Sequence, residues 1–226
     1  MGLGKALLDL LFPPKCAVCG KLLDGDDHTG ICPACDNDLP RTAREERKVD
    51  FLSSVSAALY YEGDTRRMIL RYKFENVPAL SRPMGRLIGE KLRTDAIPFD
   101  VLTWVPLSTR RFRQRGYDQA KLLAEAVGEE MGTRPAALLR KIRHVHPQSD
   151  LRTPEERRAN ISGAYAVLPG ADVRGKRILL VDDVITTGST VSECARMLLM
   201  AGAAEVRAVS VAFPRRDKKT GNITLR

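Results

Sequence analysis

The most regular hydrophobic segment of the chain is Ile178 to Val181, four apolar residues with no polar residue between them. A short unbroken run of this kind predicts a strand that is covered on both faces, as the strands of parallel sheets are. Asp182 and Asp183 follow at the expected end of that strand. The chain therefore places two carboxylates at one edge of a predicted sheet.

A helix is predicted directly after this strand. One helical face collects the apolar residues Val191, Ala195, Leu198 and Leu199. Thr190 and Glu193 have the spacing of a capping box at the helix start. Gly202 stands where a left-handed residue is expected to end the helix.

Similar patterns recur along the rest of the chain. Further strands are predicted at Val55–Tyr61, Val101–Pro106, Ala164–Val167 and Arg207–Ala212. Helices are predicted from a cap at Asp64 to Phe74, at Leu80–Leu92, and in a segment that ends near Met131. This alternation predicts an α/β fold, with a parallel sheet flanked by helices.

The first part of the chain has a different character. Met1 to Phe12 predicts a short amphipathic helix that Pro13 ends, and we expect it to pack on its own domain, with peripheral membrane contact as the alternative. Residues 41–50 are charged and lack periodicity, so they are interpreted as a linker. The predicted domains are residues 1–40 and residues 51–226.

Composition adds a constraint on partners. The chain has 226 residues, with 37 Lys and Arg against 28 acidic residues and a net charge of +9. This excess favours anionic partners such as nucleotides, pyrophosphate, nucleic acid or an acidic membrane surface, without choosing among them. No apolar stretch has the length of a membrane span. Without a signal-peptide pattern, the chain is expected in the cytoplasm.

Four of the five cysteines form two Cys-x-x-Cys pairs: Cys16, Cys19, Cys32 and Cys35. Two such pairs can supply four thiolates to one tetrahedral Zn²⁺. Disulfides would need an oxidising compartment, for which no feature argues. A ribbon of this size cannot build its own core, so we expect a structural zinc that substitutes for one. Contact of the ribbon with nucleic acid or protein is the alternative role.

The loop after the acidic pair consists almost entirely of small hydroxyl residues around one glycine: Thr186, Thr187, Gly188, Ser189 and Thr190. Main-chain N–H groups at the start of a helix bind phosphate, and the helix dipole favours negative charge there. Two carboxylates beside a phosphate need another ligand, and sugar hydroxyls or a bound Mg²⁺ meet that need. The alternative is a purely structural role, in which the loop is an ordinary turn and the aspartates are solvated.

Residues 178 to 190 resemble the signature of type I phosphoribosyltransferases, which bind phosphoribosyl pyrophosphate (PRPP). The resemblance implies that Asp182 and Asp183 hold the ribose hydroxyls as the catalytic pair, and that Thr186 to Thr190 wrap the 5-phosphate. It also implies Mg²⁺ bound together with PRPP, and catalysis by positioning and charge stabilisation without a protein nucleophile.

A basic segment follows the strand predicted at Val101–Pro106. The resemblance places the pyrophosphate loop at Pro106, Leu107 and Ser108, with Arg110 and Arg111 as further candidate pyrophosphate ligands. Arg113 and Arg115 are candidates for contact with nucleic acid, and a solvated basic helix start is the alternative.

The chain resembles the ComF family of type I phosphoribosyltransferase-like proteins over nearly its whole length. The resemblance rests on the signature above, the cysteine pairs, the Val-Pro-Leu-Ser segment and the Arg-Gly-Tyr-Asp-Gln segment at 115–119. Asp118 departs from the asparagine usual in that family. An added carboxylate there would weaken anion binding or pair with an arginine.

Three functions follow from the resemblance. The first is a Mg²⁺-dependent phosphoribosyltransferase whose acceptor the sequence does not identify. The second is an accessory of DNA uptake in natural transformation, which binds single-stranded DNA and other competence proteins. Aromatic residues for base stacking are scarce, at 5% of the chain. The third is a sensor that binds PRPP without turnover.

Overall fold

A parallel sheet between two layers of helices forms the body of the protein. The computed structural model describes residues 13–23, 29–43, 47–108, 112–113, 116–143, 161–216 and 223–224. Within these ranges the main sheet has the strand order β1-β6-β5-β2, and each neighbouring pair is parallel. Its strands are β1 (Ser54–Tyr60), β2 (Val101–Trp104), β5 (Arg177–Val184) and β6 (Glu205–Phe213).

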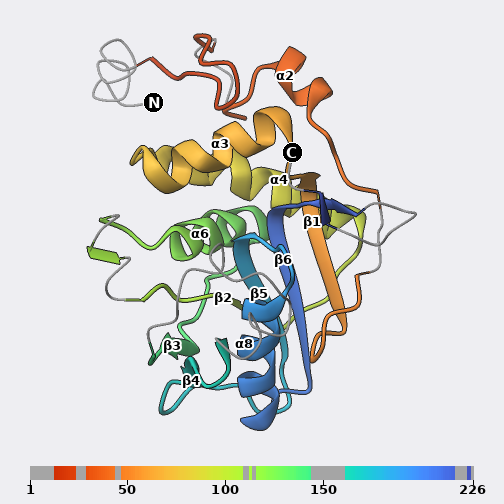
Figure 1. Cartoon of the computed structure of the whole chain (residues 1–226), viewed down its shortest axis with the longest axis vertical. Helices are drawn as coiled ribbons and strands as arrows, with labels where there is room; N and C mark the ends of the chain where they lie inside the picture. The colour runs from red at the N-terminus through yellow and green to blue at the C-terminus, as the bar shows by residue number, and fades with distance from the viewer. Residues whose placement is uncertain are drawn as a thin grey trace.

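The helices that position the site lie on both sides of this sheet and at its carboxyl edge (Figure 1). They are α3 (Gly63–Phe74), α4 (Ser81–Thr94), α6 (Gln119–Met131) and α8 (Ser189–Met200), with a 3-10 turn at Pro78–Leu80. The short helix α2 (Pro33–Asp38) belongs to the N-terminal part of the chain and lies beyond α3 in Figure 1. Two small antiparallel pairs complete the described elements: β3 (Leu139–Lys141) with β4 (Tyr165–Val167), and β7 (Arg215–Arg216) with β8 (Ile223–Thr224).

Alternating residues of β5 enter two separate hydrophobic cores. Leu179 and Val181 pack in a core shared with α3, α4 and α6. Ile178 and Leu180 pack in a second core shared with α8 and the β3–β4 pair. All four side chains are at most 1% exposed, as predicted for a strand covered on both faces.

Two predicted helix caps are wrong. Gly188, with φ of +83°, is the N-cap residue of α8, so Thr190 lies inside the helix and does not cap it. Glu193 instead accepts the N–H of Gly163 at 2.8 Å and pairs with Arg196, so it does not form a capping box with Thr190. Asp64 is likewise not a cap, because it lies inside the first turn of α3.

The predicted strands also differ from the structure in extent and in pairing. The acidic pair lies within β5, which continues to Val184. The strand predicted at Val101–Pro106 ends earlier, at Trp104. The strand predicted at Ala164–Val167 pairs with β3 outside the main sheet. By contrast, Gly202 has φ of +101° directly after the α8 C-cap, as predicted.

The chain before β1 covers part of the outer edge of that strand. Thr42 donates its N–H to the carbonyl of Ala58 at 3.0 Å, and Tyr60 donates to the carbonyl of Pro40 at 2.8 Å. These contacts extend the sheet beyond β1 at its carboxyl half.

Arg47, within the segment interpreted as a linker, is 5% exposed. Its guanidinium lies 3.4 Å from the ring centroid of Phe213 and donates to the carbonyl of Pro214. The segment interpreted as a linker therefore contacts the sheet at Thr42 and Arg47. The domain boundaries themselves stay predictions, and the helix predicted at Met1 to Phe12 lies outside the described residues. No helix in the described ranges has the length and apolarity to cross a membrane.

Candidate functional site

The loop between β5 and α8 forms a small hollow at the carboxyl edge of the sheet. Its volume is about 40 Å³. It is lined by Asp182, Val184, Ile185, Thr186, Gly188, Ser189, Thr190 and Val191. The structure thus brings Asp182 together with four residues of the predicted 5-phosphate loop, at the amino end of a 12-residue helix. Main-chain N–H groups at such a helix end suit an anion.

Internal contacts give this loop its shape. The hydroxyls of Thr187 and Ser189 lie 3.0 Å apart, and the Ser189 N–H donates to the Thr187 hydroxyl at 3.4 Å. A Cβ on Gly188 would lie 2.8 Å from both terminal carbons of Val49. Glycine is therefore required at position 188 for two reasons: the backbone has a positive φ, and the segment that precedes β1 approaches too closely for a Cβ.

The two acidic residues point to opposite faces of β5. Asp182 lies on the α8 side and lines the hollow. Asp183 lies on the α3 side, where its carboxylate is 2.7 Å from the Lys73 ammonium. The Asp183 N–H donates to the Asp182 carboxylate at 2.8 Å. Sequence reasoning treated the pair as equivalent, whereas the structure gives each acid different neighbours.

Burial is the main cause that raises the pKa of Asp182 to about 7, and the negative charge of Asp183 raises it further. Lys73 and the Asp183 N–H act in the opposite direction. The carboxyl edge therefore carries one acid whose charge is disfavoured and one whose charge has a cationic partner.

Asp118 fixes the segment between β2 and α6. Its carboxylate accepts the N–H of Lys121 at 3.1 Å, which caps α6, and the N–H of Leu107 at 3.4 Å. Burial raises the pKa of Asp118 against the effect of these N–H groups. Its other hydrogen-bond partners include the side chain of Trp104 and the N–H of Ala120, and none of these described partners is an arginine.

The predicted pyrophosphate loop is described only in part. Pro106, Leu107 and Ser108 follow β2, and Ser108 is buried. Arg110, Arg111 and Arg115 lie outside the described residues. Arg113 is exposed beside Phe112, which is 48% exposed.

Two tyrosines join α3 to the start of α6. The Tyr72 hydroxyl donates to the carbonyl of Gln119 at 2.7 Å. The Tyr117 hydroxyl donates to the carbonyl of Tyr72, one of the last carbonyls of α3 and thus without a helical partner. Burial raises the pKa of Tyr72, so its hydroxyl stays protonated and available as a donor. Hydrogen bonds therefore fix the end of α3 against the Tyr-Asp-Gln segment.

The four cysteines predicted as zinc ligands gather at one point. Their sulfur atoms all lie within 4.8 Å of one another, and those of Cys19 and Cys32 are 3.9 Å apart. A tetrahedral site with Zn–S bonds of about 2.3 Å places the sulfurs about 3.8 Å apart, so the four thiols fit Zn²⁺.

Within the cluster, the surroundings favour ionisation of one sulfur, that of Cys16. Burial works against ionisation of Cys16, but hydrogen bonds from the N–H groups of Cys19, Cys32 and Val18 outweigh it and lower the pKa of this thiol to about 6. Burial and the neighbouring thiols raise the pKa of Cys35. Thiolates are the form that binds zinc, and a metal would bring the remaining thiols to that form.

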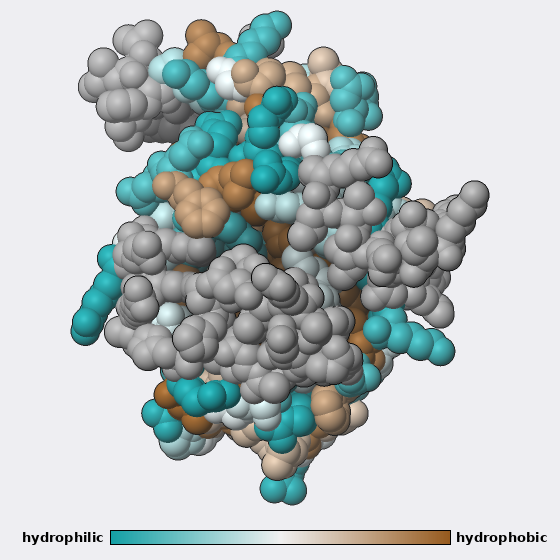
Figure 2. Space-filling view, viewed as in Figure 1, coloured by the Kyte–Doolittle hydropathy of each residue, from teal (hydrophilic) through white to brown (hydrophobic). Residues whose placement is uncertain are grey.

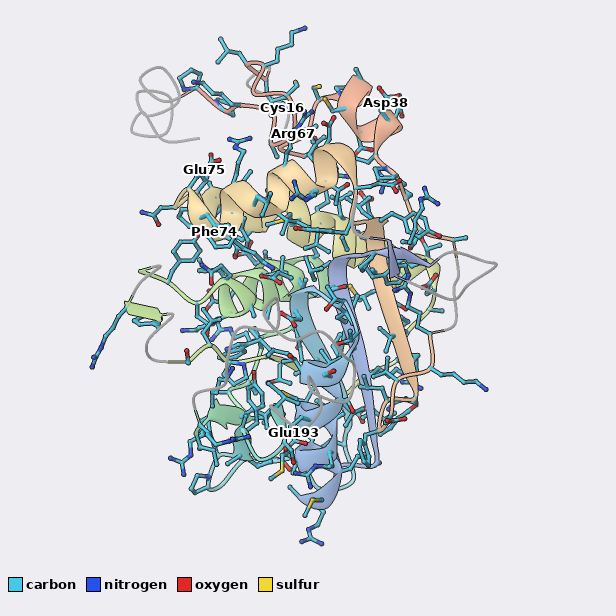
Figure 3. All side chains as sticks on the ribbon, viewed as in Figure 1. Cys16, Asp38, Arg67, Phe74, Glu75 and Glu193 are labelled. Carbon is cyan, nitrogen blue, oxygen red and sulfur yellow. The ribbon has the colours of Figure 1, made fainter. Side chains whose placement is uncertain are left out.

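The zinc cluster lies directly over α3 (Figure 3). Cys16, Ala17 and Ile31 belong to the same hydrophobic core as Met68 and Tyr72 of α3. Arg71 also donates from its guanidinium to the carbonyl of Ala17, at 3.0 Å. The ribbon is therefore joined to the helix that carries Lys73. The outer surface of α3 is mostly hydrophilic in the view of Figure 2.

Two family models match the chain. The Phosphoribosyl transferase domain matches residues 115–223, and the Double zinc ribbon domain matches residues 7–46. With the parallel sheet and its flanking helices, these matches confirm the fold class predicted from the sequence. The four clustered cysteines form the zinc-binding part of the ribbon.

Relatives cover most of the chain. The DNA utilization protein YhgH of Salmonella typhi is 29% identical over 85% of this chain and 87% of its own length. Competence protein F of Haemophilus influenzae is 30% identical over 62% of this chain and 64% of its own length. Among solved structures, the glutamine phosphoribosylpyrophosphate amidotransferase of B. subtilis is 24% identical, with a TM-score of 0.45. That match covers 66% of this chain and 31% of the amidotransferase.

Sequence reasoning missed Lys73. Its place among the arginines of α3 indicated a solvated polar face. The pairing with Asp183 joins residues 110 positions apart, 183 minus 73, and no local pattern in the sequence signals it.

Proposed function

Because this chain belongs to the ComF family of phosphoribosyltransferase-like proteins, we propose that it binds PRPP at the carboxyl edge of the sheet. The observation that carries the proposal is the hollow in which Asp182 and the loop Thr186 to Thr190 meet at the start of α8. The helix end suits the 5-phosphate, and carboxylates beside it suit the hydroxyls of the sugar.

We assign the ribose hydroxyls to the acidic pair at the carboxyl edge, with Asp182 inside the hollow and Asp183 on the opposite face of β5 beside Lys73. We assign the pyrophosphate to the segment after β2, at Pro106, Leu107 and Ser108. Mg²⁺ fits an edge whose side-chain donors are carboxylate and hydroxyl oxygens. It would neutralise the pyrophosphate and keep most of its waters, so no residue is assigned to it. The protein's own contribution is to hold the sugar and orient its anomeric carbon.

Calorimetry tests the binding step. Wild-type protein is titrated with PRPP in the presence of Mg²⁺ and compared with the double variant Asp182→Ala and Asp183→Ala. We expect the variant to lose PRPP binding and to retain its zinc, because the cysteine cluster lies on the far side of α3 from the acids. Retained PRPP affinity in the double variant would refute the site assignment. Release of pyrophosphate with a panel of bases then separates a transferase from a sensor that binds without turnover.

A second candidate function is binding of single-stranded DNA during DNA uptake. The names of the relatives refer to competence and DNA utilization. In this chain, exposed Phe112 and Arg113 offer an aromatic ring beside a cation, the combination that binds single strands. The test is affinity for an oligonucleotide as a function of salt, because phosphate contacts give a slope that scales with their number. Affinity that does not change with salt would argue against it.

A further inference from the structure

Lys73 occupies an unusual position for a lysine near the end of a surface helix. Its side chain is 19% exposed and that of Asp183 is 12% exposed, with 2.7 Å between Nζ and Oδ1. The next residues, Phe74 and Glu75, are exposed, so a solvated position lies close by. Burying an ion pair costs solvation energy, and a long flexible side chain avoids that cost unless its partner compensates.

Three carboxylates act on one another at this edge. Both Asp183 and Asp118 raise the pKa of Asp182 through their negative charge. The positive charge of Lys73 acts against them and lowers the pKa of Asp182. Cys194 of α8 also faces Asp182, and its thiol is buried. A ligand with several negative charges therefore meets an acidic edge at which Lys73 is paired with one of the acids.

The two residues that precede Lys73 fix this end of α3 to other segments. Arg71, two residues earlier, is bonded to the zinc ribbon through the carbonyl of Ala17. Tyr72, one residue earlier, is bonded to the start of α6 through the carbonyl of Gln119. Lys73 therefore stands on a helix end that Tyr72 and Tyr117 join to residues 117–119, where Asp118 in turn accepts the N–H of Leu107 in the segment to which the pyrophosphate was assigned.

We infer that Lys73 is a specificity-determining residue that recognises the pyrophosphate of PRPP. In the free protein its ammonium neutralises Asp183. When the ribose hydroxyls donate hydrogen bonds to Asp183, the Lys73 ammonium binds the pyrophosphate instead. The pyrophosphate carries the negative charge that ribose 5-phosphate lacks. The inference rests on the proposed function and identifies the residue that distinguishes these two ligands.

The test compares two ligands in each of four proteins. Wild type, Lys73→Gln, Lys73→Arg and the control Arg66→Gln are titrated with PRPP and with ribose 5-phosphate, both in Mg²⁺. Arg66 is exposed on the same helix. Glutamine can still donate a hydrogen bond to Asp183, which protects the fold. Because a hydrogen bond between charged groups is worth about 1.5 to 3 kcal/mol, Lys73→Gln should weaken PRPP binding on the order of 10- to 100-fold.

The preference for PRPP over ribose 5-phosphate is the decisive quantity, since both affinities come from the same folded molecules. We expect this preference to fall in Lys73→Gln, to survive in Lys73→Arg and to be unchanged in Arg66→Gln. An equal loss for both ligands, or tighter PRPP binding in Lys73→Gln, overturns the inference. If wild type itself fails to bind PRPP, the proposed function fails instead. If wild type binds and all variants keep its preference, only the role of Lys73 is refuted.

Discussion

Replacing Gly188 with alanine tests how the phosphate loop is shaped. Gly188 has φ of +83°, and an alanine in the left-handed region costs roughly 1 to 2 kcal/mol. Its Cβ would also lie 2.8 Å from Cγ1 and Cγ2 of Val49, a contact closer than real Cβ atoms make. Overpacking of this kind costs about 1 to 3 kcal/mol. We therefore expect Gly188→Ala to lower the free energy of unfolding by about 2 to 5 kcal/mol.

A matched variant separates the two contributions. Gly170 has φ of +77°, and a Cβ there would meet nothing within 4 Å. Gly170→Ala should therefore show the backbone cost alone, about 1 to 2 kcal/mol. The clash with Val49 is isolated by a double-mutant cycle with Val49→Ala, in which we expect the second substitution to relieve the first.

The assay is urea unfolding followed by far-ultraviolet circular dichroism, with zinc held constant. Three results would refute the reasoning: a Gly188→Ala effect no larger than that of Gly170→Ala, a cycle without coupling to Val49, or unchanged PRPP affinity in Gly188→Ala if the wild type binds. The first two concern packing and the third concerns the assigned function of the loop.

Three other predictions follow from the site. Cys16→Ser should reduce the zinc content and lower the melting temperature, because the binding energy of the metal contributes to folding. The control Cys194→Ala should leave the zinc content unchanged. Equal zinc content in the two variants would contradict this prediction. Asp118→Ala should cost about 1 kcal/mol in urea unfolding through loss of the α6 cap, and Asp118→Asn should keep the cap while tightening binding of an anionic ligand. The pKa of Asp182 is raised from 3.8 to about 7 in the folded protein. Between these two values the folded protein holds a proton that the unfolded chain has lost. The contribution of Asp182 to stability therefore falls as the pH rises through that interval. When the free energy of unfolding is measured across this pH interval, Asp182→Asn should flatten its pH dependence. Asp183→Asn should destabilise the protein at neutral pH, because it breaks the ion pair with Lys73. Identical pH slopes for wild type and Asp182→Asn would be contrary evidence.

The sequence predicted the parts of the fold that depend on neighbouring residues. The run Ile178 to Val181 is buried on both faces, which leaves little ambiguity about its place in the sheet. The helix that ends at Met131 and the two Cys-x-x-Cys pairs are likewise local patterns. Each of these features carries its own evidence within a few residues.

Features that depend on distant segments could not be predicted. Thr190 and Glu193 have a capping spacing, yet Glu193 bonds to Gly163, which lies 30 residues away. Whether Asp182 and Asp183 act together depends on α3, since it is Lys73 that holds Asp183. Strand pleating places adjacent residues on opposite faces, but only the packed helices determine what each face meets.

The pairing of Pro40 and Thr42 with β1 has a practical consequence for work on fragments. An exposed strand edge is a template for pairing with another chain. A shortened protein that begins at residue 51 would lack the segment that caps the carboxyl half of this edge. Such a fragment should self-associate at concentrations where the intact chain stays monodisperse, because residues 40–42 no longer cover this edge of the sheet.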